Sequence, residues 1–191
     1  MADSALEDRE LIDRYLRGDG RAFSELVARH RDLIYNLCRR TVGVAEEAED
    51  LTQEIFIRLL DKVGLWRGEA KFTTWLYRLA LNHCRDHLRR RRPETVVADD
   101  ALADFMPGPE SRAETGDLRE RVQQALMSLP VDWRAVVFLR DIEGLSYSEI
   151  AAILEIELGT VKSRLARARL ALARILAPLR EQTGPPTHQR G

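Results

Sequence analysis

The sequence lacks the features that mark secreted, membrane-spanning and β-sheet proteins. Among its 191 residues are two cysteines, Cys38 and Cys84, too few for the disulfide framework of a small secreted protein. Its longest uninterrupted apolar runs have five residues, whereas a membrane-spanning helix needs about 20. The acidic N-terminus has no hydrophobic stretch that could act as a secretory signal. We therefore expect a cytoplasmic protein.

Strand signals are also nearly absent, and apolar residues instead recur with the period of a helix along most of the chain. This predicts an all-α fold. Capping residues, glycines and prolines mark where the expected helices begin and end. The helices are expected at about 8–17, 21–40, 45–62, 72–91, 113–127, 130–141, 146–154 and 161–176.

Residues 93–112 interrupt the helical pattern. They contain three prolines and many acidic residues, a composition typical of linkers. We therefore predict two small helical domains, a bundle over 1–92 and a helix-turn-helix domain over 117–180. An acidic flexible linker over 93–116 is expected to join them, and 181–191 to form a disordered tail.

The overall charge of −1 conceals a strong segregation of charge along the chain. Residues 71–92 carry a net charge of +6, residues 93–117 carry −6, and residues 159–180 again carry +6. Two basic blocks around an acidic one suggest two nucleic-acid contacts joined by an acidic connector. Charge alone favours the simpler interpretation of solvated helix faces, so the arrangement of residues on each helix has to decide.

The last expected helix has the pattern of a DNA-recognition helix. Its apolar residues lie on one face, while Ser163 and Arg167 lie opposite and Lys162 and Arg164 flank them near the helix start. A capping-box pattern from Ser146 to Glu149 begins the preceding helix. Two helices with a short turn and a basic second helix predict a helix-turn-helix that reads duplex DNA.

The helix expected over 72–91 has a different kind of polar face. Trp75, Arg78, Asn82, Arg85 and Arg89 share one side, and apolar residues fill the other. An aromatic side chain among cations suits single-stranded DNA, because bases stack on the ring and cations follow the backbone. A tryptophan half-buried against a neighbouring helix would give the same pattern, and the residues alone do not separate the two interpretations.

The helix before it, over 45–62, has an acidic outer stripe. Asp50, Gln53, Glu54 and Ile57 lie opposite its apolar residues. Acidic residues repel DNA, and an isolated isoleucine among them is typical of a protein-binding surface. We expect the partner there to be a protein.

Together these segments resemble bacterial sigma factors of the extracytoplasmic-function class over about residues 8–178. Residues 48–56 are similar to region 2.2, which grips the clamp helices of RNA polymerase. Residues 72–80 with Asn82 resemble region 2.3, which handles the melted minus-10 promoter element. Residues 67–72 resemble the loop that captures a flipped-out base there, and 144–151 and 159–165 resemble the region 4 helix-turn-helix that reads the minus-35 element.

The resemblance implies an alternative-sigma transcription initiation factor with no catalysis, cofactor or metal site of its own. It would direct core RNA polymerase to specific promoters and help melt them, contacting the beta-prime clamp helices, the beta flap and promoter DNA. The linker would pass through the polymerase toward the RNA exit path. Members are usually held inactive by an anti-sigma factor, often one anchored in the membrane.

The resemblance also assigns candidate contacts. Polymerase-binding candidates are Glu49, Asp50, Gln53, Glu54 and Ile57. Minus-10 candidates are Lys71, Phe72, Trp75, Arg78, Asn82, Arg85 and Arg89. Minus-35 candidates are Ser146, Tyr147, Thr160, Lys162, Ser163, Arg164, Arg167 and Arg169.

Two other classes of protein compete with this interpretation. A two-domain DNA-binding regulator that works without polymerase would have no use for the acidic stripe. A metal protein is suggested by His83 and His87, four residues apart on one helix with Cys84 and Asp86 between them. Two ligands make an incomplete zinc site, so we expect the histidines to be structural.

The charge blocks lead to one expectation about the free chain. Domains that carry +6 blocks and are tied by a −6 linker should attract one another at low salt. The isolated protein should then be compact and bind promoter DNA poorly until polymerase separates the domains. Because surface charges would hold this state, compaction should loosen as salt rises.

Overall fold

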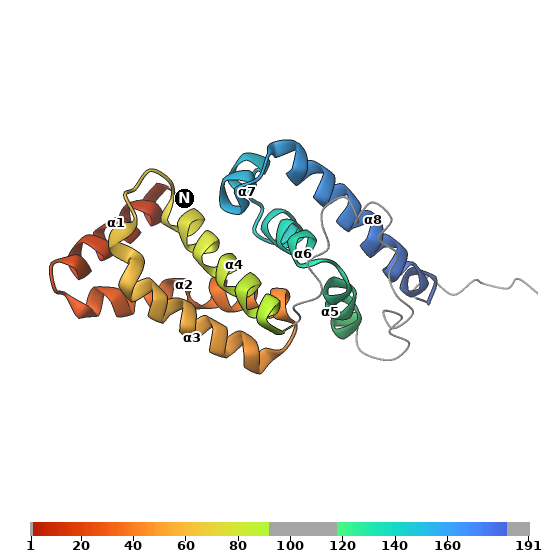
Figure 1. The fold of residues 1–191 in the computed structure, drawn as a ribbon, viewed down its shortest axis with the longest axis horizontal. Helices are drawn as coiled ribbons and strands as arrows, with labels where there is room; N and C mark the ends of the chain where they lie inside the picture. The colour runs from red at the N-terminus through yellow and green to blue at the C-terminus, as the bar shows by residue number, and fades with distance from the viewer. Residues whose placement is uncertain (1, 92–117, 183–191) are drawn as a thin grey trace, which may run out of the picture.

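The computed structural model describes residues 2–91 and 118–182, and within these ranges all regular structure is helical (Figure 1). The expected linker, 93–116, lies outside the described residues, as does the start of the helix expected at 113. Of the expected tail, 181–191, the first two residues belong to helix α8 and the rest lie outside the described residues. The elements are α1 Ala2–Leu16, α2 Gly20–Val42, α3 Ala45–Lys62, a 3-10 turn Val63–Leu65, α4 Phe72–Arg91, α5 Leu118–Ser128, α6 Val131–Val137, a π-helical turn Phe138–Ile142 (η4), α7 Tyr147–Leu154 and α8 Leu158–Gln182.

Helices α1–α4 form the N-terminal bundle, and their ends follow from local chemistry. The Asp19 side chain caps α2 by accepting a hydrogen bond from the Arg21 backbone N–H. Gly43 ends the same helix with φ of 88°, a left-handed conformation that favours glycine. Between α1 and α2, His30 Nε2 lies 2.9 Å from Asp8 Oδ1, and both side chains are buried. Burial of such polar groups is tolerated because they pair.

Helices α5–α8 form the C-terminal domain. The expected capping box is present at the start of α7, where Ser146 accepts from the Glu149 backbone and Glu149 accepts from the Ser146 backbone. Trp133 of α6 and Leu165 and Ala168 of α8 are buried in one apolar cluster. Helices α7 and α8 follow each other across a short turn and pack together, as the predicted helix-turn-helix requires.

Several helix boundaries differ from expectation: α1 begins at Ala2 and not at 8, and α8 ends at Gln182 and not at 176. Two further differences have a local reason. Helix α8 begins at Leu158 and not at 161, since Gly159 takes helical backbone within the first turn. The helix expected over 130–141 is α-helical only to Val137 and widens into η4, where the Glu143 N–H donates to the Phe138 carbonyl. Such π-turns carry no simple signature in hydrophobic periodicity.

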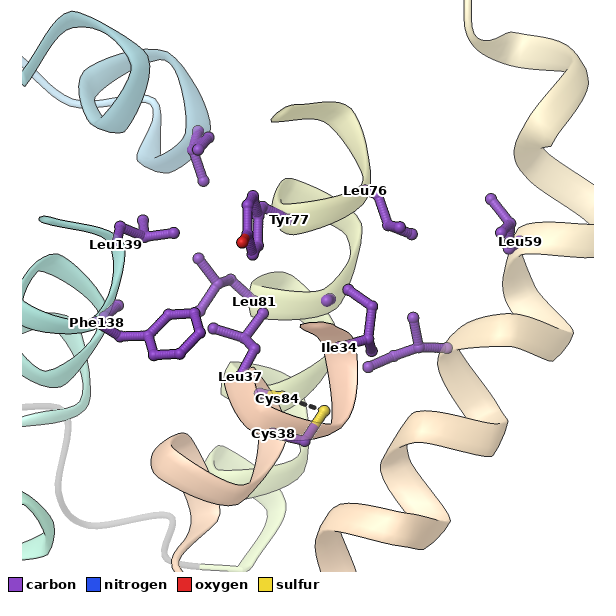
Figure 2. Close-up of a cluster of buried hydrophobic side chains, with 14 of the residues drawn as sticks. Ile34, Leu37, Cys38, Leu59, Leu76, Tyr77, Leu81, Cys84, Phe138 and Leu139 are labelled. Atoms are coloured by element: carbon purple, nitrogen blue, oxygen red, sulfur yellow. Dashed lines mark hydrogen bonds between the residues drawn. The ribbon is translucent and has the colours of Figure 1, made fainter. Parts of the chain in front are cut away.

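The two domains pack against each other through α4. A single apolar cluster contains Tyr77 and Leu81 of α4 together with Phe138, Leu139 and, from α7, Ile150. Figure 2 shows Phe138 and Leu139 approaching Tyr77 and Leu81. The Tyr77 and Phe138 ring centroids are 6.4 Å apart in an edge-on arrangement.

This contact matches the expected compactness and adds an apolar centre that charge patterning did not predict. We expected surface charge to hold the domains, whereas the centre of their contact is apolar and buried. At the far end of α2, an added Cβ on Gly43 would stand 2.7 Å from Met127 Sδ of α5. Such close approach of backbone to a side chain across the domains is a packed interface, which salt screens weakly.

Candidate nucleic-acid interface

The outer face of α8 presents its predicted basic residues to solvent. Lys162, Ser163 and Arg167 are exposed, and Ser163 Oγ donates to the Thr160 carbonyl at 3.0 Å. These residues lie in the first turns of the second helix of the helix-turn-helix, where side chains reach base edges in the major groove. Leu170, on the same outer side, is 54% exposed.

On this helix the structure corrects the prediction that Arg164 contacts DNA. Its side chain is only 9% exposed, and Nη1 lies 3.1 Å from Asp132 Oδ2 of α6. Arg164 precedes the core residue Leu165, so the helix turns it inward, and Asp132 offsets the cost of burying its charge. Arg164 therefore ties α8 to α6 and is not placed to contact DNA.

The remaining minus-35 candidates lie around the helix-turn-helix with polar partners. Arg169 pairs with Asp141, with Nε 3.2 Å from Oδ2. Ser146 is exposed and caps α7. Tyr147 is half-buried under the Arg140 guanidinium, whose carbon is 4.9 Å from the ring centroid. Thr160 is half-buried.

Helix α4 carries the predicted mixed face. Trp75, Arg78 and Arg85 are half-buried, whereas Asn82 and Arg89 are exposed. Arg85 Nη1 lies 3.5 Å from Asn82 Oδ1, one turn along the helix. The opposite side of α4 is buried in the bundle, with Leu76, Ala80 and Cys84 in the core. The structure thus brings the aromatic ring, the amide and the cations together.

On this face the structure corrects the prediction that Phe72 contacts DNA. It is 1% exposed, and its ring packs edge-on against Trp66 with centroids 5.6 Å apart and stacks near Trp75 at 6.0 Å. An aromatic ring at the first helical position is drawn into the core, which removes more apolar area from water than a surface position would. Phe72 supports the two tryptophans and does not face a ligand.

A cavity of about 160 Å³ opens at the N-terminal end of α4. Its walls combine aromatic rings with polar and charged groups from the preceding loop and the first two turns of α4. The Trp66 indole N–H donates to the Ala70 carbonyl at 3.1 Å, which holds the loop closed beside the cavity. The lining residues are Leu65, Trp66, Arg67, Glu69, Ala70, Thr74, Trp75 and Arg78.

The acidic stripe of α3 is exposed as predicted. Glu49, Asp50 and Gln53 face solvent, and Ile57 among them is 61% exposed. Glu54 differs because its Oε2 lies 2.6 Å from Nε2 of His83 on α4. The His83 side chain is only 1% exposed, and this burial lowers the pKa of its imidazole despite the neighbouring carboxylate.

The histidines and cysteines of α4 have structural partners. His87 Nε2 lies 3.5 Å from Glu47 Oε2, so His83 and His87 face different carboxylates. Among the described residues, no three His, Cys, Asp or Glu side chains are grouped so that they could hold a metal ion. Cys84 Sγ donates to Cys38 Sγ at 3.7 Å in the core (Figure 2), and this hydrogen bond lowers the pKa of the Cys38 thiol.

Sequence reasoning missed the partners of three basic residues on α4 or just before it. Lys71, Arg78 and Arg85 each contact an acidic residue of the C-terminal domain. These partners lie between 47 and 78 positions away in the chain. No local spacing could have revealed them, since they depend on how two domains pack.

Comparisons with known proteins identify a family for both domains of the chain. A family model described as Sigma-70 region 2 matches residues 26–94, and one described as Sigma-70, region 4 matches residues 119–172. The chain is 40% identical over 186 residues to the RNA polymerase sigma-H factor of Pseudomonas aeruginosa, covering 91% of this chain and 95% of that one. It is 37% identical over 185 residues to the ECF RNA polymerase sigma-E factor of Escherichia coli, covering 91% and 96%.

Two solved structures share the fold. CnrH, in complex with the cytosolic domain of CnrY, aligns with a TM-score of 0.67 and 27% identity over 90% of this chain and 98% of that chain. The sigma factor RpoE of Bartonella quintana, in complex with the anti-sigma factor NepR, aligns with a TM-score of 0.63 and 24% identity over 81% and 96%. The second likeness is one of fold alone. Among the described helices, none is both long and apolar enough to cross a membrane.

Proposed function

Because the chain belongs to the extracytoplasmic-function (ECF) sigma factors, we propose that its two domains divide promoter recognition between α4 and α8. The protein is an alternative transcription initiation factor that binds core RNA polymerase and promoter DNA. Its domains are the helical bundle over 1–92 and the helix-turn-helix domain over 117–180.

The face of α4 takes the melted minus-10 strand. The single observation that carries this assignment is the cavity at the head of α4, walled by Trp66 and Trp75 and edged by Arg78. An unstacked base can enter such a cavity and stack on an indole, while Lys71 and the α4 arginines follow the phosphates. The buried Phe72 ring packs against both indoles and supports their positions.

The outer face of α8 reads the minus-35 duplex. Lys162 and Arg167 are exposed and not held by an acidic partner among the ion pairs of the described residues. Arginine and lysine match the N7 and O6 acceptors of guanine in the major groove. Ser163 and Arg169 then fix the register of the helix through phosphates.

The acidic stripe on α3 contacts the polymerase. Glu49, Asp50 and Gln53 are exposed on the turns of α3 that precede the exposed Ile57, so an apolar anchor lies next to charged and polar groups. Glu54 contributes to the same surface while bonded to His83, which fixes its position. The stripe lies on α3 and faces away from the hydrophobic core, whereas the proposed DNA contacts lie on α4 and α8. Polymerase and DNA can therefore be bound at the same time.

Sequencing the DNA captured by reconstituted holoenzyme tests the function. Fragments enriched by the chain together with core polymerase should share a two-part motif. Neither core polymerase alone nor the chain alone should enrich it. Enrichment of the same motif by the chain without polymerase would favour the competing interpretation, a regulator that acts alone.

We also propose that the protein works in the cytoplasm, leaves the chemistry of RNA synthesis to the polymerase, and is held inactive by an anti-sigma factor. In the two similar structures, CnrH is bound to the cytosolic domain of CnrY and RpoE to the anti-sigma factor NepR. An inhibitor that covers the α3 stripe would block polymerase binding directly. Co-purification of the chain from cells followed by mass spectrometry would identify it.

A further inference from the structure

Three cations at the minus-10 face of α4 are already occupied by acidic or carbonyl groups of the C-terminal domain. Lys71 Nζ lies 2.9 Å from Glu149 Oε1 of α7. Arg78 Nη1 lies 3.1 Å from Glu155 Oε1, and its Nη2 donates to the Ala152 carbonyl at 2.8 Å. These are the oxygen ligands that a DNA phosphate would otherwise supply.

The pairing continues along α4 toward α6. Arg85 Nε donates to Asp132 Oδ1 at 3.0 Å, and Asp132 is the same residue that holds Arg164. The Tyr77 hydroxyl donates to Glu143 Oε2 at 2.7 Å. Burial and this carboxylate together raise the pKa of the Tyr77 phenol far above its usual range. The contacts therefore extend from Lys71, just before α4, to Arg85 within it.

An apolar centre lies beneath these polar contacts. Tyr77 and Leu81 are buried beside Phe138 and Leu139 (Figure 2), and Ile150 belongs to the same cluster. Figure 1 shows α7 facing α4 on the side away from α3, and α6 also contacts α2. A buried apolar contact ringed by ion pairs has the composition of a specific interface.

We propose that this interface is a self-inhibited state of the free factor, in which Glu149, Glu155 and Asp132 occupy the phosphate-binding cations of α4. The proposal rests on the proposed function of α4. Single-stranded DNA and the C-terminal domain would then compete for the same groups. The apparent affinity of the free chain for single-stranded DNA is then the affinity of the open form multiplied by the fraction of molecules that are open.

The test uses the full chain with two substitutions that leave the DNA-contacting residues intact. Glu143→Ala removes the acceptor of Tyr77, and Glu155→Lys places a cation beside Arg78. Residue 155 has φ of 56°, and lysine adopts this backbone with the same difficulty as glutamate. Glu157→Lys, an exposed position two residues on, is the control that matches the charge change of Glu155→Lys, and Glu157→Lys with Glu120→Ala matches that of the double variant.

Two measurements are made on each free protein. Small-angle scattering reports the radius of gyration, and fluorescence anisotropy reports binding to a short single-stranded DNA of mixed sequence. The double variant should have a larger radius than the wild type and bind this DNA about tenfold more tightly, as expected if about 1.4 kcal/mol of interdomain contact is lost. The Glu157→Lys control should keep the wild-type radius and bind less tightly than the double variant.

Two outcomes would overturn the proposal. One is a wild-type radius as large as that of the double variant, and the other is an opened variant whose DNA affinity equals that of the control. If the double variant fails to fold, Glu155→Lys alone is judged by the same criteria. Promoter melting by holoenzyme carrying Trp75→Ala and Asn82→Ala then tests the proposed function of α4 separately. If this variant fails to melt the promoter, the proposed function stands and only self-inhibition is wrong. If it melts the promoter normally, the proposed function of α4 is wrong as well.

Discussion

The pairing of His83 with Glu54 couples the core of the bundle to its polymerase-facing stripe. Burial lowers the pKa of His83 in the folded protein, with Glu54 opposing the shift and Arg58 and Arg90 adding to it. The unfolded chain therefore binds the proton more readily than the folded one does. The stability from this residue is present above its unfolded pKa of about 6.5 and is lost as the pH falls below it.

We predict that His83→Gln makes the free energy of unfolding less dependent on pH between about 6.5 and 5, where an ordinary histidine gains its proton. Urea unfolding at a series of pH values measures this dependence. The wild type should lose stability more steeply than the variant as the solution becomes acidic. Equal slopes would show that His83 is not the titrating group.

Exposed and buried basic residues on α8 should behave differently on substitution. Arg167→Ala should weaken binding of holoenzyme to duplex minus-35 DNA by about 1–3 kcal/mol and relax specificity if the arginine contacts a base. Lys162→Ala should weaken all sequences alike if it contacts a phosphate. Arg164→Ala should instead lower the stability of the domain, because Asp132 would lose its buried partner. Binding titrations and thermal unfolding of the three variants separate these effects.

Helix α3 presents one surface whose loss should be selective. Asp50→Lys with Ile57→Ala should weaken binding to core polymerase by about 2 kcal/mol or more, because an exposed apolar anchor and its rim charge are both removed. Asp61→Lys, exposed near the end of the same helix, provides the matched control. Pull-down titration with core polymerase measures both. Unchanged affinity in the double variant would place the polymerase contact elsewhere.

Sequence reasoning succeeded at this scale where periodicity and capping act locally. The spacing of apolar residues placed α3 and α4 at their observed bounds, and Ser146 with Glu149 marked the start of α7. It failed where a residue is recruited by another element. Arg164 is drawn inward by Asp132 of α6, and Phe72 by the tryptophans. A helical-wheel projection of a single helix shows neither Asp132 nor the tryptophans, because they belong to other segments or depend on tertiary packing.

The contact between domains determines how the whole molecule responds to salt. Because Tyr77, Leu81, Phe138 and Leu139 are buried at its centre, we predict that the free protein stays compact as salt rises. Ion pairs at the rim weaken, since at 1 M salt charges are screened beyond about 3 Å. Small-angle scattering over a salt series checks this. A radius that grows steadily with salt would restore the purely electrostatic attraction that charge segregation suggested.

Promoter melting by reconstituted holoenzyme tests the division of labour between the domains most directly. Permanganate footprinting, which modifies unpaired thymines, is applied to a promoter selected by the wild-type holoenzyme. Holoenzyme with Trp75→Ala and Asn82→Ala should still bind the promoter but leave the minus-10 thymines unreactive, whereas wild-type holoenzyme makes them reactive. Normal reactivity with the double variant would contradict the assignment of the α4 face to the melted strand.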